Sequence, residues 1–220
     1  MNILAIETSI EKLSISLRQN NSKIKTISEE SSMHHLVELI PLLKELLEIN
    51  HLILDDIDYI AIDEGPGSFT GLRIGITTVR TLSQIKKIPI IPIDALKSYV
   101  YLTDKDKIVI PILDARVNQI YGGAFYRTAD NIESIIETNV YEKNDFLEKV
   151  KMIKKNAKLE FYGDTKKIFP RLKPSFFLYN NSKCILKLAE YILLKGFRKV
   201  PYDKILPKYY RLSEAERKLQ

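Results

Sequence analysis

The order of predicted strands and helices is the feature of this sequence that most constrains its fold. In the first half, hydrophobic periodicity predicts three strands, a helix, a strand and a second helix. A further strand and a short helix follow them in the sequence. After a polar, charge-alternating linker, "TDKDK" (103–107), the order of three strands, helix, strand and helix returns. Strands are predicted at 2–7, 12–19, 23–28, 58–62, 89–94, 108–115, 118–126, 132–138 and 159–163, and helices at 34–49, 69–85, 143–155 and 183–195.

This order predicts the fold class. Alternating strands and helices indicate α/β layers in which helices cover a mixed sheet. The halves share no sequence repeat, but the first strand of each ends in an acid, Glu7 or Asp114. Two such halves facing each other across a cleft are the plan of the actin, Hsp70 and sugar-kinase (ASKHA) superfamily. We therefore predict a two-lobed actin-like fold, each lobe β-β-β-α-β-α, with an N-terminal lobe at 1–104 and a C-terminal lobe at 105–220.

The composition excludes several classes of protein. At 45% hydrophobic and 28% charged residues the chain is typical of soluble globular proteins, and no apolar run approaches the roughly 18 residues needed to cross a bilayer. A single cysteine, Cys184, excludes an intramolecular disulfide framework and a cysteine-cluster metal site. We expect a cytoplasmic protein without a membrane partner.

Charge is distributed unevenly along the chain. Residues 1–107 hold 12 Lys and Arg against 15 Asp and Glu, a net of −3, and residues 108–220 hold 22 against 13, a net of +9. The asymmetry is compatible with a nucleic-acid face or with lysines that merely solvate helix surfaces. We favour the second interpretation, because no basic run interleaved with aromatic residues stands out.

A glycine-rich stretch, "DEGPGSFTGLRIG" (63–75), contains four of the eight glycines. It follows a predicted strand and precedes a helix, where anions often bind. A phosphate loop needs a lysine that the stretch lacks, and the dinucleotide fingerprint needs glycine where Thr70 stands. We assign a structural loop instead, in which Ser68 caps the helix. The loop residues are Gly65, Pro66, Gly67 and Ser68.

The expected nucleotide cleft is degenerate. In nucleotide-binding members of this superfamily the hairpin after each first strand carries glycines that let backbone N–H groups reach phosphate. The corresponding segments here, "ETSIEKLS" and "DARVNQIY", contain none. Glu7, Asp114 and Arg116 are assigned to this cleft, and a buried Asp114–Arg116 ion pair is favoured. We assign no catalytic residue, no metal and no cofactor, and leave weak nucleotide binding open.

Two helices predict a partner surface. Apolar residues cover about two-thirds of the circumference of helix 34–49, more than one sheet-facing stripe needs, so the surplus indicates an interface. In helix 69–85, Gly71 and Gly75 share one face, which either admits a partner helix or packs against helix 34–49. The predicted partner-binding residues are Leu36, Leu39, Leu42, Leu43, Leu46, Gly71, Gly75 and Thr78.

Six segments, distributed in order over the whole chain, resemble the TsaB (YeaZ) family. They are "ILAIETS", "HHLVELIPLLKELL", "IAIDEGPGSFTGLRIG", "PIIPIDAL", "ILDARVNQIYGGAF" and "PKYYRLSEAERK". One departure is Glu7, where many members have Asp. The resemblance implies a subunit that lacks the metal-binding histidines and competent ATP site of its catalytic relative TsaD. It also implies that the N-terminal helices bind TsaD, and that the same surface can form a homodimer.

The resemblance further implies a role in tRNA modification. TsaD transfers a threonylcarbamoyl group to the adenosine beside the tRNA anticodon, the ATPase TsaE joins the complex, and TsaB serves as a required, non-catalytic scaffold that meets tRNA indirectly. Two alternatives stay open: a stand-alone actin-fold ATPase or small-molecule kinase, and a direct tRNA-binding module that uses the basic second lobe. The glycine-free hairpins weigh against the first.

Overall fold

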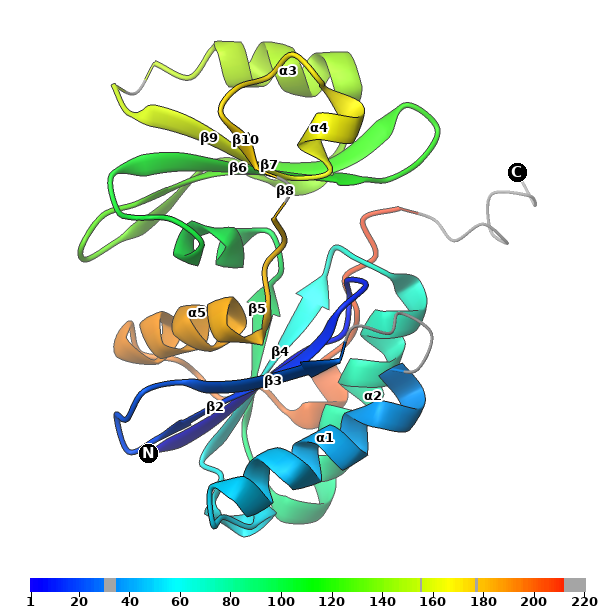
Figure 1. The fold of residues 1–220 in the computed structure, drawn as a ribbon, viewed down its shortest axis with the longest axis vertical. Helices are drawn as coiled ribbons and strands as arrows, with labels where there is room; N and C mark the ends of the chain where they lie inside the picture. Colours follow the sequence, from blue (N-terminus) through cyan, green and yellow to red (C-terminus); the bar gives the residue numbers. More distant parts are fainter. Residues whose placement is uncertain (30–34, 155, 177, 212–220) are drawn as a thin grey trace. The chain divides into compact units, whose positions relative to one another are not determined.

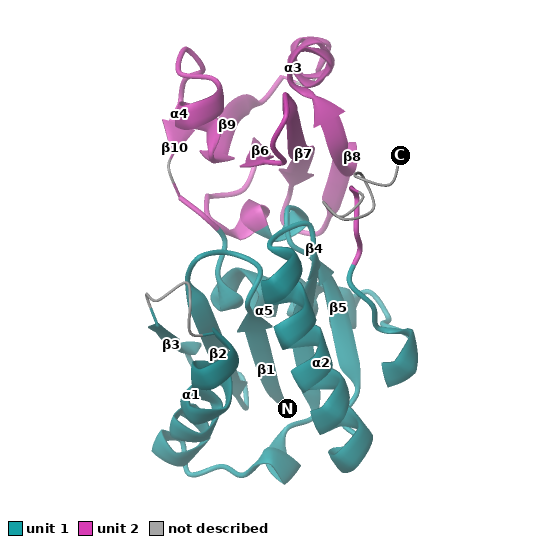
Figure 2. Cartoon of the chain, turned by 90° about the vertical axis from the view of Figure 1, so that its right-hand side faces the viewer, with its two compact units in different colours: residues 1–98, 180–207 teal, residues 99–179, 208–220 magenta. Residues whose placement is uncertain are grey.

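A computed structural model describes residues 1–29, 35–154, 156–176 and 178–211. The chain forms two compact units, coloured separately in Figure 2: residues 1–98 with 180–207, and residues 99–179 with 208–220. The predicted first residue of helix 34–49 lies outside the described residues, as does the C-terminal resemblance segment beyond residue 211.

The first unit is built on a five-stranded mixed sheet of order β3-β2-β1-β4-β5 (Figure 1). Its first three strands form an antiparallel meander, and β4 and β5 continue the sheet in parallel with β1. Short 3-10 turns at Leu54–Asp56, Lys97–Tyr101 and Tyr202–Lys204 accompany these elements. The strands are β1 (Asn2–Glu7), β2 (Leu13–Gln19), β3 (Lys25–Glu29), β4 (Tyr59–Gly65) and β5 (Ile90–Asp94).

Helices cover both faces of this sheet. Side chains alternate along β2, so its apolar residues face α1 (His35–Ile49) and α2 (Phe69–Lys86), while its serines face α5 (Ser182–Leu194). The Ser16 and Ser182 hydroxyls hydrogen bond at 2.8 Å, and the Ser182 N–H donates to Ser14 Oγ at 2.9 Å. These bonds satisfy polar groups buried between α5 and the sheet.

The return of α5 to the first sheet divides the chain differently from the predicted boundary between residues 104 and 105. The helix buries Ile185, Leu188 and Ala189, and packs against β1 and β2. An open sheet needs apolar cover on both faces, and α1 and α2 supply only one of them. Sequence order alone placed this helix in the C-terminal lobe.

The second unit contains another five-stranded mixed sheet, of order β10-β9-β6-β7-β8. Its core joins the apolar side chains of β6 and β7 to Phe146 and Val150 of α3 (Lys143–Lys151), and α4 (Thr165–Ile168) lies near β10. Two mixed sheets with helices confirm the predicted α/β class. The strands are β6 (Lys107–Asp114), β7 (Gln119–Arg127), β8 (Ile132–Glu142), β9 (Lys158–Gly163) and β10 (Ser175–Phe176). Among the described helices, none has the length and hydropathy to span a bilayer.

Candidate functional site

The loop before α2 is held against the connection between β1 and β2. The Ser68 N–H donates to the Ser9 carbonyl at 2.7 Å, and Ser68 Oγ accepts from the Gly71 N–H at 3.2 Å. The predicted N-cap is therefore confirmed. Gly65 has φ 111°, a conformation that favours glycine, and a Cβ on Gly67 would lie 2.4 Å from Ser9 Cβ. These contacts make the segment from Gly65 to Ser68 a tightly packed turn.

Gly71 and Gly75 lie close to Thr8 of the same chain. A Cβ on Gly71 would lie 1.9 Å from the Thr8 carbonyl oxygen, and one on Gly75 would lie 2.3 Å from Thr8 Oγ1. The glycines allow α2 to approach the end of β1 this closely. The structure places Thr8, not helix 34–49, nearest to both glycines, a neighbour that sequence spacing could not reveal, and the partner groove stays a prediction.

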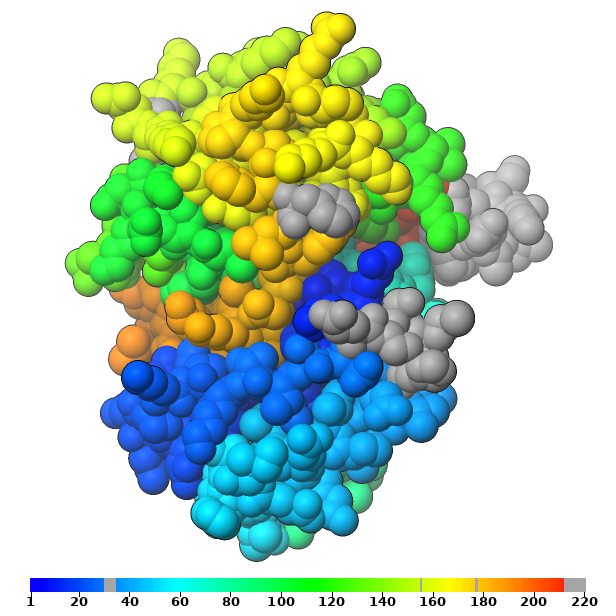
Figure 3. Space-filling model, viewed as in Figure 1, coloured from blue at the N-terminus to red at the C-terminus, as the bar shows by residue number. Residues whose placement is uncertain are grey.

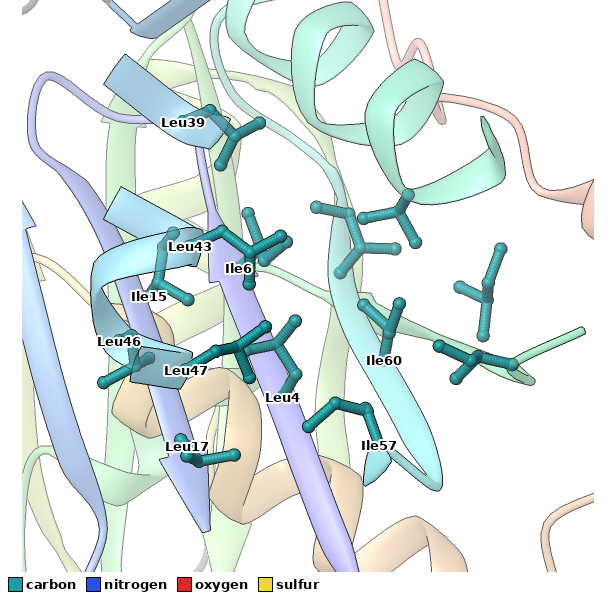
Figure 4. Close-up of a cluster of buried hydrophobic side chains, with 14 of the residues drawn as sticks. Leu4, Ile6, Ile15, Leu17, Leu39, Leu43, Leu46, Leu47, Ile57 and Ile60 are labelled. Atoms are coloured by element: carbon teal, nitrogen blue, oxygen red, sulfur yellow. The ribbon is translucent and has the colours of Figure 1, made fainter. Parts of the chain in front are cut away.

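Three of the predicted partner residues on α1 belong to the core of the first unit. Leu39, Leu43 and Leu46 are only 1%, 5% and 1% exposed. Figure 4 shows them directed toward the apolar side chains of β1 and β2. Their assignment to a partner surface is therefore corrected: they form the sheet-facing stripe of the helix. Leu42 is half-buried and packs against the same cluster.

α1 exposes three apolar residues near its N-terminal end and also Ile49, its last residue, which is 57% exposed. Leu36, Val37 and Ile40 are 72%, 65% and 50% exposed, and their spacing puts them on one side of the helix. We call these three residues the outer apolar face of α1. Charged residues follow along the exposed side, including Lys44 and Glu48, which form an ion pair at 3.6 Å.

This face agrees with the sequence prediction only in part. Leu36 was predicted, whereas Val37 and Ile40 were missed, although the surplus apolar arc was the signal that could have found them. Thr78, the remaining predicted residue on α2, is half-buried. Periodicity showed that apolar side chains were in excess, but the position of the sheet determined which of them stay exposed.

A buried carboxyl pair, Glu7 and Asp63, lies at the ends of the neighbouring parallel strands β1 and β4. Glu7 accepts hydrogen bonds from the Ser9 N–H at 2.7 Å, the Ser9 hydroxyl at 2.8 Å and the Asn180 amide at 3.0 Å. Burial raises the pKa of Glu7, although these donors offset part of the rise. Burial, followed by the charge of Glu7, raises the pKa of Asp63 well above its ordinary value. The hydrogen-bond donors converge on Glu7, so we assign the proton of the pair to Asp63.

The pair should leave a signature in the pH dependence of stability. A raised folded-state pKa means that the folded protein holds the Asp63 proton more tightly than the unfolded chain does. The resulting stabilisation is complete below the ordinary pKa and is lost as pH rises through the folded-state value. In Asp63→Asn there is no such proton to lose. The melting temperature of the variant should therefore rise relative to wild type as the pH increases above about 4, the ordinary pKa of Asp.

Thermal melts over this range, followed by circular dichroism, measure the effect. Glu45→Gln is the matched control, because Glu45 is an exposed carboxylate in the same unit. A difference between Asp63→Asn and wild type that stays constant with pH would contradict the assignment.

In the second unit, Asp114 has a different environment from the one expected. Its Oδ1 accepts from the Arg116 N–H at 2.8 Å, and its Oδ2 pairs with Lys167 at 3.2 Å. Partial burial raises the pKa of Asp114, but the Arg116 N–H and Lys167 outweigh it and lower the value overall. Arg116 has an exposed side chain and φ 64°. The favoured buried Asp114–Arg116 ion pair is therefore wrong.

No group of three or more His, Cys, Asp or Glu that could hold a metal ion occurs within the part of the chain that the structure describes. His35 is buried, and its Nε2 lies 3.1 Å from the Glu11 carbonyl oxygen. That contact gives the ring a structural role at the start of α1. The outer apolar face of α1 is the candidate site that these observations single out.

Two five-stranded mixed sheets with these helices define an actin-like protein of the ASKHA class. The chain superposes on YeaZ from Pseudomonas aeruginosa with a TM-score of 0.81 and 24% identity, over 95% of this chain and 100% of that one. The family model described as "TsaD: tRNA N6-adenosine threonylcarbamoyltransferase" matches residues 20–193.

Curated relatives narrow this class to one family. The tRNA threonylcarbamoyladenosine biosynthesis protein TsaB of Buchnera aphidicola subsp. Schizaphis graminum is 32% identical over 84% of this chain and 90% of its own length. The protein of the same name from Bacillus subtilis is 29% identical over 99% of this chain and 97% of its own length. The chain belongs to the TsaB (YeaZ) family, whose members take part in this tRNA modification, and the resemblance read from the sequence is confirmed.

Proposed function

We propose that this chain is a required, non-catalytic subunit that binds a TsaD-like catalytic subunit, with a TsaE-like ATPase, during threonylcarbamoyl transfer to the adenosine beside the tRNA anticodon. The observation that carries the proposal is the outer apolar face of α1. Membership of the TsaB family indicates the pathway in which the chain acts. The outer apolar face of α1 is the surface that we propose binds the catalytic subunit.

The composition of the exposed side of α1 fits a protein interface. Leu36, Val37 and Ile40 form a compact apolar centre, and charged residues such as Lys44 and Glu45 lie beside it. Interfaces commonly combine an apolar core with a polar rim that stays in water. The same face suits a second copy of this chain, so a homodimer would compete with the catalytic subunit for it.

The environment of the first hairpin favours a role without catalysis. The Ser9 N–H donates to Glu7, and the Ser9 carbonyl accepts from the Ser68 N–H. Both backbone polar groups of Ser9 therefore already have partners within the chain. Phosphate-binding hairpins instead offer free N–H groups to the ligand. Glu7 and Asp63 are both 0% exposed, which withholds their carboxyl groups from a substrate.

The test combines binding with a cellular readout. The purified chain is mixed with the TsaD-like subunit of the same cell, and the mass of the complex is measured by size-exclusion chromatography with light scattering. Mass spectrometry then quantifies modified tRNA nucleosides after depletion of the chain. A stable complex and loss of threonylcarbamoyladenosine are expected. Rapid ATP turnover by the chain alone, with normal tRNA after depletion, would instead support the kinase or ATPase alternative.

A further inference from the structure

A groove lies on the surface of the second unit, along the segment that joins β9 to the end of β10. Its volume is about 680 Å³, and it is open to solvent rather than enclosed. The segment is coloured yellow to gold in Figure 3 and is exposed on the face shown. The groove is lined by Lys166, Pro170, Leu172, Lys173, Pro174, Ser175 and Phe176.

The charge along this segment is of one sign. Residues 165–176 contain four Lys or Arg and no Asp or Glu. One of these cations, Lys167, is paired with Asp114. Lys166, Arg171 and Lys173 are exposed and have no acidic partner among the residues that the structure describes. The groove therefore presents uncompensated positive charge at its edge.

An aromatic ring completes the groove. Phe176 stacks on Tyr162 with ring centroids 5.2 Å apart and an interplanar angle of 25°, and it remains 40% exposed. Tyr162 is held in place because its hydroxyl donates to Glu160 at 2.9 Å. Phe176 is thus a partly exposed ring on a fixed support, in a groove that Lys166 and Lys173 also line.

We propose that this groove binds single-stranded RNA, with a base stacked on Phe176 and neighbouring phosphates held by Lys166 and Lys173. Non-specific single-strand sites combine a cationic track with aromatic stacking platforms in this way. An acidic peptide would use the lysines but would gain little from the ring, so RNA is the occupant that both features favour. The binding of single-stranded RNA is argued from the groove alone. The identification of that RNA as tRNA rests on the proposed function.

The proposal departs from the interpretation of charge that was favoured from the sequence. Cations and aromatic residues do alternate between Lys166 and Phe176, in "KKIFPRLKPSF". The pattern was missed because prolines interrupt it and because no regular period marks it. The structure brings its two ends together around one groove.

The experiment uses the full chain and fluorescence anisotropy with a fluorescein-labelled oligoadenylate of about twelve nucleotides, a length within the usual span of such sites. Lys166→Gln with Lys173→Gln should weaken binding about 10-fold at physiological salt and reduce the slope of log Kd against log salt by about 1.4. Phe176→Ala should weaken binding by about 5- to 150-fold and leave the slope unchanged. Phe176→Leu separates loss of stacking from loss of packing, because it keeps apolar bulk against Tyr162.

The matched control is Lys149→Gln with Lys154→Gln, which removes two other exposed lysines of the same unit. An equal loss in this control would overturn the proposal, because the binding would then be diffuse attraction to a basic surface. Tighter binding of a labelled poly-aspartate peptide, insensitive to Phe176→Ala, would assign the groove to an acidic protein partner instead. The groove variants should still bind the TsaD-like subunit without RNA, so failure here is distinguishable from failure of the proposed function.

Discussion

Gly71→Ala is expected to destabilise the first unit by about 3 kcal/mol or more, at the upper end of the usual cost of overpacking. The added methyl would lie 1.9 Å from the Thr8 carbonyl oxygen. A backbone atom cannot swing aside as a long side chain can, so α2 would have to move away from β1. That movement would also disturb the Ser68 cap, whose hydroxyl accepts from the Gly71 N–H.

Urea unfolding and thermal melts of the purified variant measure this loss of stability. A chain of this size should show a fall in melting temperature of about 6–12 °C for 3 kcal/mol. Thr77→Ala is the control on the same helix, because Thr77 is exposed and its replacement should cost little. If Gly71→Ala remained fully stable and instead lost the catalytic subunit, the glycine face would be the partner groove that the sequence predicted.

Leu36→Glu combined with Ile40→Glu is expected to weaken binding to the TsaD-like subunit by about 30-fold or more, equivalent to at least one hot-spot contact of about 2 kcal/mol. Both side chains are at least half exposed in the free chain, so the charges should leave its folding intact. In the complex the two carboxylates would be buried without partners, which is costly. Isothermal titration gives the affinity, and circular dichroism checks the fold.

Two further variants identify the cause of any effect. Ile53→Glu with Ile85→Glu adds the same charge at apolar residues that are 63% and 67% exposed outside this face, and it should bind normally. Leu39→Glu places a charge in the core and should unfold the first unit instead. Unchanged binding by the Leu36 and Ile40 variant would remove the outer apolar face of α1 from the interface.

Most of the regular elements could be predicted because their signals are local. The strand predicted at 2–7 is observed over the same residues, and the helix predicted at 69–85 begins and ends within one residue of Phe69–Lys86. Each rests on periodicity and caps within a short window. The short elements α4 and β10 were missed, because segments of four and two residues carry almost no periodic signal.

The candidate site was predicted less well, for a physical reason. Leu36 and Leu39 are chemically equivalent in the sequence and only three residues apart, yet one is 72% exposed and the other 1%. A helix with a wide apolar arc can turn either side toward a sheet. The choice depends on contacts with residues far away along the chain.

The sequence by itself determined the α/β class, the order of the elements, the cap at Ser68 and the family resemblance, because these depend on local pattern or on residue identity. Only the tertiary structure decided that α5 returns to the first sheet, that Gly71 meets Thr8 and that Glu7 meets Asp63. Each of those contacts joins segments separated by more than fifty residues. No local sequence preference specifies such a contact. It depends on how both segments pack on the same sheet.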